Sequence, residues 1–311
     1  MTGLRDHGGG LDAAMARFGG DRTDWLDLST GINPVPYPVG QVDAAAWMTL
    51  PDQAAVQALE QAARAFWVVP AGAALLAGPG ASALIARLPQ TCRAGSIRIP
   101  GPTYNEHAAA FDSAGWTVTD TAAPAQVVVH PNNPTGRLWQ ATDITAPFAI
   151  IDESFCDMRP DQSLIGLATR PGTVILKSFG KFWGLAGLRL GFAIGDPAII
   201  GKLADSLGPW PVSGPALQIG TQALHDSAWA AATRDRLATD AARLDKLMIR
   251  KGAVLIGGTS LFRTYAVKNA ADWQTRLARN HIWSRIFPYS TDWLRLGLPH
   301  PDRWDQLETA L

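Results

Sequence analysis

The chain has 311 residues, and its 27 Lys and Arg residues balance its 27 Asp and Glu residues, so it carries no net charge at neutral pH. A neutral chain has no overall basic field that would attract nucleic acid or an anionic membrane surface. Apolar residues make up 47% of the sequence, which is enough to bury a sizeable core and excludes a disordered chain. We therefore expect a globular protein with no nucleic-acid partner.

Cysteine content and hydropathy narrow the class of protein further. Cys92 and Cys156 are the only cysteines, too few for a disulfide framework or a cysteine-based zinc site, and no metal is expected. The uncharged run 65–86 has the length of a membrane span, but several Pro and Gly residues interrupt it, as in a strand, a loop and a helix start. The N-terminal residues include no apolar stretch of signal-peptide length. We expect a soluble, cytoplasmic protein with no membrane partner.

Residues 1–45 are rich in Gly, Pro and Asp and contain one short extended segment at 25–28. Residues 46–208 then begin with a predicted amphipathic helix at 52–66. Short apolar runs follow at 74–77, 96–99, 127–130, 148–151, 173–176 and 190–194, with helical stretches predicted at 81–89, 105–114 and 140–145. Apolar strands that alternate with helices predict an α/β domain with a mostly parallel sheet covered on both faces.

The pattern changes in residues 209–311. A long helical segment is predicted at 215–251, and shorter strands at 254–256, 260–267, 282–287 and 294–297. This order predicts a long connecting helix and a smaller α+β domain, to which the arm 1–45 contributes.

In an open parallel sheet, ligands bind beyond the carboxyl ends of the strands. Gly78-Pro-Gly-Ala-Ser82 follows the first predicted strand and precedes a helix. Small residues let the backbone approach an anion, and the first turn of a helix offers N–H groups to a phosphate. A strand-to-helix turn that merely requires glycine explains this segment equally well.

Polar motifs follow the later strands as well. They are Pro131-Asn-Asn-Pro-Thr-Gly136, Asp152-Glu-Ser-Phe155 and Ser178-Phe-Gly-Lys181, with Arg189 eight residues after Lys181. A lone Asp at a strand end is commonly a helix cap, and a lone Lys is usually solvated. Chance is a poor explanation for all of these motifs in this order, so they indicate one site.

This order of motifs resembles the fold-type I enzymes that use pyridoxal 5′-phosphate (PLP), in the class I/II aminotransferase group, over nearly the whole chain. The resemblance implies a large PLP-binding domain whose central sheet is sandwiched by helices. It also implies that Lys181 forms the Schiff base with the cofactor and that Asp152 pairs with the pyridine nitrogen. Lys177 is a second candidate, but only Lys181 has a Ser three residues before it and an Arg eight residues after it.

The resemblance assigns further residues to the cofactor and the substrate. Asn133 would hydrogen-bond the 3′-oxygen of the ring, and Tyr104 would stack on the ring face. The cofactor phosphate would be held by Ala81, Ser82, Ser178 and Arg189. Arg295, in the segment 294–299, would bind the substrate carboxylate, although an ion pair with Asp292 at a strand edge is an alternative.

The arm resembles the start of the L-threonine-O-3-phosphate decarboxylases of cobalamin synthesis, in which this segment runs close to the active site. The similar segments are His7-Gly-Gly-Gly, Leu26-Asp-Leu-Ser29 and Gly31-Ile-Asn-Pro34. Phe155, where most of the group has a Tyr, agrees with this resemblance. It implies loss of CO₂ from L-threonine O-3-phosphate, with His7, Asn33 and Ser29 as candidates to bind the substrate. A surface turn is the alternative for His7.

Two other functions stay open. One is an aminotransferase acting on a phosphorylated amino substrate such as histidinol phosphate, and the other is a fold-type I scaffold without turnover. The resemblance also implies a homodimer with its sites at the interface. In the aminotransferase relatives a Tyr-Pro-Asp segment reaches the neighbouring subunit's cofactor, whereas this chain has Leu50-Pro-Asp52 without the phenol.

Overall fold

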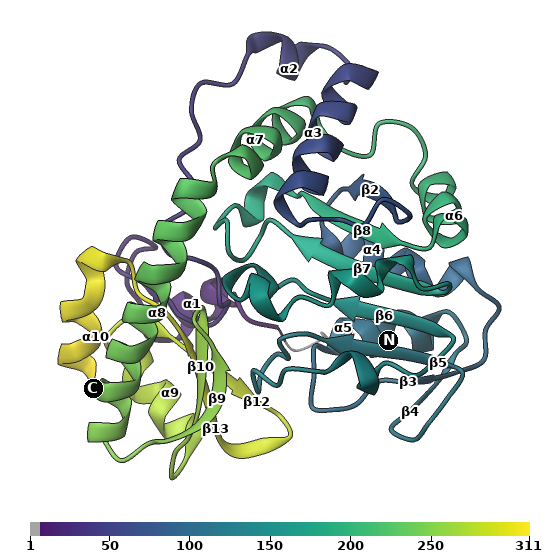
Figure 1. Ribbon diagram of the computed structural model, residues 1–311. Helices are drawn as coiled ribbons and strands as arrows, with labels where there is room; N and C mark the ends of the chain where they lie inside the picture. Colours follow the sequence, from purple (N-terminus) through teal and green to yellow (C-terminus); the bar gives the residue numbers. More distant parts are fainter. Residues whose placement is uncertain (1–6) are drawn as a thin grey trace. The chain divides into compact units, whose positions relative to one another are not determined.

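The computed structural model describes residues 7–311, and the chain forms two compact units, drawn in Figure 1. The larger unit is Pro36–Ala232, and the smaller unit combines the residues up to Val35 with Thr233–Leu311. These boundaries differ from the expected ones, because residues 36–45 and 209–232 belong to the larger unit. Helices α2 (Ala44–Met48) and α7 (Gly214–His225) pack on each other there, and α7 packs on α3 (Gln53–Phe66).

The larger unit is built on a seven-stranded sheet with the order β2-β8-β7-β6-β5-β3-β4. Of these seven strands, β8 alone runs in the direction opposite to the other six, so the predicted, mostly parallel α/β architecture is confirmed. The strands are β2 (Ala74–Gly78), β3 (Ser96–Arg98), β4 (Thr117–Thr119), β5 (Ala125–Val129), β6 (Phe148–Asp152), β7 (Thr173–Ser178) and β8 (Gly191–Gly195). Strand β4 was not predicted, because its edge position leaves its side chains exposed or half-buried and it has no apolar run.

Helices flank this sheet (Figure 1). They include α3, α4 (Ala81–Arg87), α5 (Asn105–Ser113) and α6 (Pro197–Leu207). Apolar side chains of α4, α5 and α6 pack with those of the strands in the core. The Asp52 side chain caps α3 by accepting a hydrogen bond from the Ala55 amide. The predicted helix at 140–145 is wrong: the segment makes one 3₁₀ turn, Ala141–Asp143. Pro147 follows closely, and a helix cannot continue into a proline.

The smaller unit contains an antiparallel sheet with the order β12-β13-β10-β9. Its strands are β9 (Val254–Thr259), β10 (Phe262–Ala266), β12 (Arg285–Phe287) and β13 (Ser290–Gly297), and its helices are α1 (Leu11–Phe18), α9 (Ala270–Ala278) and α10 (Trp304–Ala310). The arm joins this unit through β1 (Leu26–Asp27), which pairs in parallel with β11 (Ile282–Trp283). The run predicted as one strand at 282–287 is therefore divided between two sheets.

The long helical segment predicted at 215–251 consists of two helices, α7 and α8 (Ser227–Arg250). The break falls at Asp226, whose backbone is not helical and whose carboxylate accepts a hydrogen bond from the Trp229 amide. Such a contact is typical of a helix N-cap, which starts a new helix. Within residues 7–311, no helix combines the length and the apolar character that a membrane crossing needs.

Candidate active site

A pocket of the larger unit opens at the carboxyl ends of β6 and β7. All eight residues that the family resemblance assigns to the cofactor line it: Ala81, Ser82, Tyr104, Asn133, Asp152, Ser178, Lys181 and Arg189. They come from separate segments of the chain. The parallel sheet therefore brings together side chains that are up to about a hundred residues apart in the sequence. Phe155 and Gly80 also line this pocket.

Asp152 ends β6, and its carboxylate is buried. One oxygen, Oδ1, accepts hydrogen bonds from the amide and the hydroxyl of Ser154, at 2.9 and 2.6 Å. The other oxygen, Oδ2, lies 2.8 Å from Nε2 of His107. Burial alone would raise the pKa of the Asp152 carboxyl, but the contacts with His107 and Ser154 hold this pKa below its ordinary value. The pocket therefore contains a fixed negative charge.

His107 is a site residue that the sequence analysis missed. It lies on α5, is fully buried, and its Nδ1 has no hydrogen-bond partner. Since Asp152 is ionised, the ring must donate a proton from Nε2 to Oδ2. The signal in the sequence is the spacing from Tyr104: residues three apart project from the same side of a helix, and the two rings meet edge to face with centroids 6.1 Å apart.

Lys181 lies in the turn that follows β7. The turn is closed by hydrogen bonds from the Gly184 amide to the Lys181 carbonyl, at 3.1 Å, and from the Gly180 amide to Ser178 Oγ, at 3.2 Å. The Lys181 ammonium lies 5.4 Å from the centre of the Phe155 ring. Lys177 is instead buried within β7 and paired with Glu153, so the geometry favours Lys181 as the lysine that meets a ligand.

Two glycines allow close approaches at the first turn of α4: Gly80 admits the Arg189 guanidinium, and Gly191 lets the backbone of β8 come close to Ala81. A Cβ on Gly80 would lie 2.8 Å from Nη2 of Arg189, and a Cβ on Gly191 would collide with the backbone nitrogen of Ala81. Arg189 itself has a left-handed backbone, with φ of 53° and ψ of 51°, which is uncommon for a side chain other than glycine. The result is a small cradle of one guanidinium and two hydroxyls, those of Ser82 and Ser178, which fits a phosphate dianion.

Asn132 connects the two segments that carry Asn133 and Tyr104. Its side-chain oxygen accepts a hydrogen bond from Thr103 Oγ1 at 2.6 Å, and its amide nitrogen donates to the Pro102 carbonyl at 3.0 Å.

Burial, reinforced by the nearby charge of Asp152, raises the pKa of the Tyr104 phenol to about 12. Tyr104 therefore stays protonated and presents an uncharged ring to the pocket. These side chains and the phosphate cradle together fit PLP.

Arg295, the candidate for the substrate carboxylate, lies on β13 in the smaller unit and is buried. It donates a hydrogen bond to the Ser29 carbonyl. The alternative pairing with Asp292 is not favoured, since residues three apart on a strand point to opposite faces and Asp292 accepts a hydrogen bond from Ser290.

Arg285 is a second residue that sequence reasoning missed. It lies directly opposite Arg295 in the β12–β13 ladder, so both side chains share one face of the sheet. Burial, together with the charge of Arg285, lowers the pKa of the Arg295 guanidinium to about 10, and the group stays cationic at neutral pH. Like charges opposite each other are destabilising unless an anion joins them. This pair could not be predicted from the sequence, because strand register cannot be read from it.

The three candidates in the arm also belong to the smaller unit. The Ser29 hydroxyl donates to Asp27 Oδ1 at 2.6 Å and accepts from the Gly9 amide at 2.7 Å, so it holds the arm together. The side-chain oxygen of Asn33 accepts from Nη2 of Arg236 at 2.7 Å, and His7 is exposed. The half-buried Arg236 is a further cation that sequence reasoning missed.

Comparison with known proteins gives one family. The family profile described as aminotransferase class I and II matches residues 121–307. The chain is similar to the threonine-phosphate decarboxylase of a Sinorhizobium species, with 40% identity over 94% of this chain and 92% of that protein. The threonine-phosphate decarboxylase of Pseudomonas aeruginosa is 37% identical over 99% and 97%. The fold is similar to that of a histidinol-phosphate aminotransferase from Sinorhizobium meliloti solved with pyridoxal-5′-phosphate, with a TM-score of 0.83, 17% identity and coverage of 99% and 94%.

Proposed function

Since the chain belongs to the aminotransferase class I and II family, we propose that it is a PLP-dependent decarboxylase of cobalamin biosynthesis. Its substrate is L-threonine O-3-phosphate, and its products are CO₂ and (R)-1-aminopropan-2-ol O-2-phosphate. The observation that carries this proposal is the similarity to two threonine-phosphate decarboxylases at 37–40% identity over at least 94% of the chain. The pocket of the larger unit is consistent with it.

We assign the lining residues to the parts of the cofactor that their chemistry suits. Lys181 holds PLP covalently through its amine, and the Asp152 carboxylate keeps the ring nitrogen protonated. Arg189, Ser82, Ser178 and the backbone at Ala81 bind the phosphate, while Asn133 and Tyr104 contact the 3′-oxygen and the ring face. When bound, PLP supplies an electron sink for the electron pair that a leaving group releases at the substrate Cα.

The choice of reaction depends on how the protein orients the substrate. The bond that breaks must stand perpendicular to the cofactor ring, because only then does it overlap with the π system. A decarboxylase therefore needs side chains that fix the substrate carboxylate and the second anionic group. We assign Arg295 to the carboxylate, with Arg285 beside it in the ladder. In the arm, we assign His7, Asn33 and Ser29 to substrate binding.

After CO₂ leaves, a general acid must deliver a proton to Cα, and we assign this step to the Lys181 ammonium. The centre of the Phe155 ring lies 5.4 Å from that ammonium. Its ring adds apolar surface at a point where a tyrosine would add an acidic hydroxyl.

We also propose that the protein is a homodimer. Trp47, Met48 and Leu50 are 69%, 76% and 65% exposed, and they follow one another in the segment from α2 to α3. Large apolar side chains exposed close together in the chain are typical of an interface, and a second copy of the chain is the partner expected for this family. Replacing Trp47 and Met48 with Glu should give monomers in size-exclusion chromatography with light scattering.

We place the protein in the cytoplasm. Cys92 and Cys156 are both free thiols, as expected for a protein of a reducing compartment. Cell fractionation with an antibody against the chain tests this location.

The experiment that tests the function supplies L-threonine O-3-phosphate without any oxo acid and measures released CO₂. Sustained release supports the decarboxylase. The alternative, an aminotransferase for a phosphorylated amino substrate such as histidinol phosphate, needs an oxo acid acceptor for repeated turnover. A scaffold without turnover would release nothing, and a colourless protein that borohydride leaves unchanged would favour it.

A further inference from the structure

A cluster of buried charged side chains lies next in the sequence to residues that line the pocket: Lys177 on β7, Glu153 just after β6, and Asp157 in the 3₁₀ turn Cys156–Met158. Lys177 Nζ lies 2.6 Å from Glu153 Oε2 and 3.7 Å from Asp157 Oδ1, and none of the three side chains is more than 4% exposed. Burial by itself would lower the pKa of the Lys177 ammonium, but the charges of Glu153 and Asp157 raise it above its ordinary value. The two carboxylates therefore keep Lys177 cationic at neutral pH.

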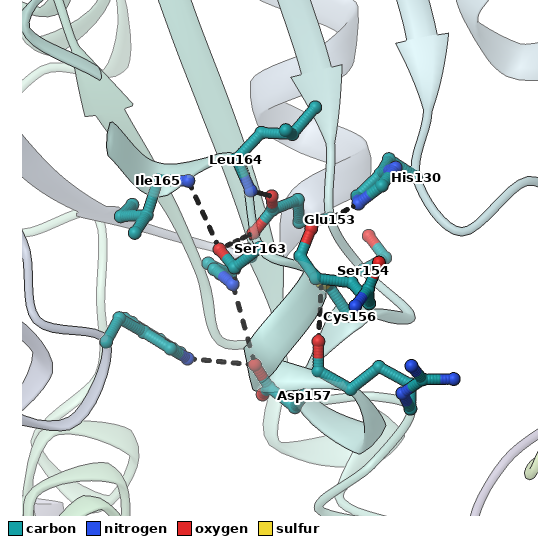
Figure 2. Close-up of polar contacts among 12 residues, drawn as sticks. His130, Glu153, Ser154, Cys156, Asp157, Ser163, Leu164 and Ile165 are labelled. Carbon is teal, nitrogen blue, oxygen red and sulfur yellow. Dashed lines mark hydrogen bonds and ion pairs between the residues drawn. The ribbon is translucent and has the colours of Figure 1, made fainter. Parts of the chain in front are cut away.

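Glu153 is held by the chain on its other side. Its Oε1 accepts a hydrogen bond from the Leu164 amide at 2.6 Å, and its Oε2 accepts one from Ser163 Oγ at 2.7 Å, as Figure 2 shows. His130 and Cys156 bring ligand-type atoms within 4.8 Å of this carboxylate. Both are already engaged: His130 accepts from the Trp139 amide and contacts the Gln162 carbonyl, and Cys156 Sγ donates to the Arg159 carbonyl. Glu153 thus serves as the partner of Lys177 and not as a metal ligand.

Asp157 connects the cluster to the turn that carries Lys181. Its Oδ2 accepts a hydrogen bond from Nε1 of Trp183 at 3.2 Å, and its Oδ1 accepts one from Nε1 of Trp67 at 2.9 Å. The Trp183 ring is stacked between Phe179 and Trp229, with interplanar angles of 11° and 13°. The Trp183 ring, two residues after Lys181, is thereby held by stacking on both faces and by a hydrogen bond from its Nε1.

Stability is a poor explanation for this cluster. Buried ion pairs lose the hydration of both charges, and apolar side chains of the same volume often stabilise a protein as well or better. What the charges do provide is a fixed geometry between segments. Glu153 directly follows Asp152, Lys177 directly precedes Ser178, and Trp183 follows Lys181 by two residues.

We propose that Lys177, Glu153 and Asp157 form an ionic brace that positions the Lys181 turn against the Asp152 carboxylate. None of the three touches the reacting atoms, so they are positioning residues. The brace sets the distance between the amine that holds the cofactor and the carboxylate that faces its ring nitrogen. This inference rests on the proposed function, because it takes the pocket to be the PLP site.

The test compares variants that neutralise the brace with one that preserves its charges. The double variant Lys177→Met with Glu153→Gln removes both charges of the closest pair, and Asp157 keeps the indole N–H groups of Trp67 and Trp183 as hydrogen-bond donors. The double variant should keep its melting temperature close to that of the parent but take up PLP covalently at least about tenfold more slowly, since small displacements of reacting groups are costly. Its kcat should fall by a similar factor with little change in KM. Lys177→Arg, which keeps the charge and the donors, should restore both rates.

The matched control neutralises a second ion pair, Arg263→Met with Asp245→Asn. These groups are 2.7 Å apart and mostly buried, in the smaller unit, and this variant should take up PLP at the parent's rate. Covalent uptake is measured by trapping the apoprotein with PLP and borohydride over time. This readout is independent of CO₂ release: a parent that takes up PLP and releases no CO₂ contradicts the proposed function and leaves the brace testable.

A double variant with the parent's uptake rate and kcat overturns the proposal. If the double variant does not fold, Glu153→Asp decides, because it keeps the charge and withdraws the carboxylate by roughly one bond length, about 1.5 Å. Slow uptake by this folded variant supports the brace, and uptake at the parent's rate overturns it. Failure of both variants to fold also overturns it, since the cluster would then be a requirement of the fold.

Discussion

His107 Nε2 lies 2.8 Å from Asp152 Oδ2, and both side chains are buried. The histidine comes from α5 and the carboxylate from the end of β6, so the contact joins the helix layer to the sheet at the floor of the pocket. Two parts of the chain 45 residues apart are therefore needed to keep one carboxylate ionised.

Replacing His107 with Leu should raise the pKa of Asp152. A hydrogen bond to a charged group contributes about 1.5–3 kcal/mol, so its loss favours the protonated form of the carboxyl. Because the folded-state pKa of Asp152 is lowered, its ionised form stabilises the fold above about pH 4, and this contribution is lost as the pH falls through the folded pKa. In His107→Leu the acid limb of the kcat profile and acid unfolding should both move to higher pH. His107→Gln, which keeps a donor, should shift them less.

Replacing Asp152 with Asn should leave PLP attached to Lys181 but slow the chemistry at Cα. The amide has nearly the shape of the carboxylate but lacks its charge, and charge matters most in a water-poor site. We expect the single-turnover rate to fall by at least about a hundredfold, similar to the loss of an electrostatic group in other active sites. Equal single-turnover rates for Asp152→Asn and the parent would contradict this role.

The two lysines should respond to replacement in different ways. Lys181→Ala should fold normally and fail to hold PLP covalently, so borohydride should fix no cofactor in it. Lys177→Ala should still hold PLP covalently through Lys181. It should lose about 3–5 kcal/mol of unfolding free energy, because Glu153 and Asp157 would remain buried without their cation. Chemical denaturation and peptide mapping after borohydride measure both effects. A labelled peptide that contains modified Lys177 would contradict the assignment.

Replacing Arg295 with Ala should raise KM and lower kcat, because this side chain would both bind and align the substrate carboxylate. Arg285→Ala should have a smaller effect of the same kind, since Arg285 is less buried than Arg295. The lone Arg295 would then have no like charge opposite it, and its pKa should rise. Steady-state kinetics with L-threonine O-3-phosphate and with L-threonine separate the effects on the carboxylate from those on the phosphate.

The motifs at the strand ends made the larger unit predictable from sequence. Asp152 and Lys181 each follow a buried apolar run, and the ends of parallel strands meet at one edge of a sheet. The family resemblance that these motifs carry then implied eight cofactor residues, and all eight are among the residues that line the pocket. The helix predicted at 140–145 was wrong, because the prediction used the apolar spacing alone and did not consider the nearby Pro147.

Long-range pairing explains what the sequence could not show. Arg285 and Arg295 meet only through the register of β12 and β13, and His107 meets Asp152 only when α5 packs against the sheet. Asp226 ends one helix and caps the next, although the segment around it reads as continuous helix. Tertiary structure places the arginine pair and His107, whereas the break at Asp226 is a local N-cap that the apolar helical pattern does not reveal.

The most direct test of the central claim is a single turnover with L-threonine O-3-phosphate and no oxo acid, in which CO₂ and the absorbance of the cofactor are followed together. We expect one CO₂ per active site, no pyridoxamine form, and a much slower reaction with L-threonine, since a site built for a phosphate leaves its donors without partners when the phosphate is missing. Accumulation of the pyridoxamine form with a keto product and no CO₂ would contradict the decarboxylase and identify an aminotransferase.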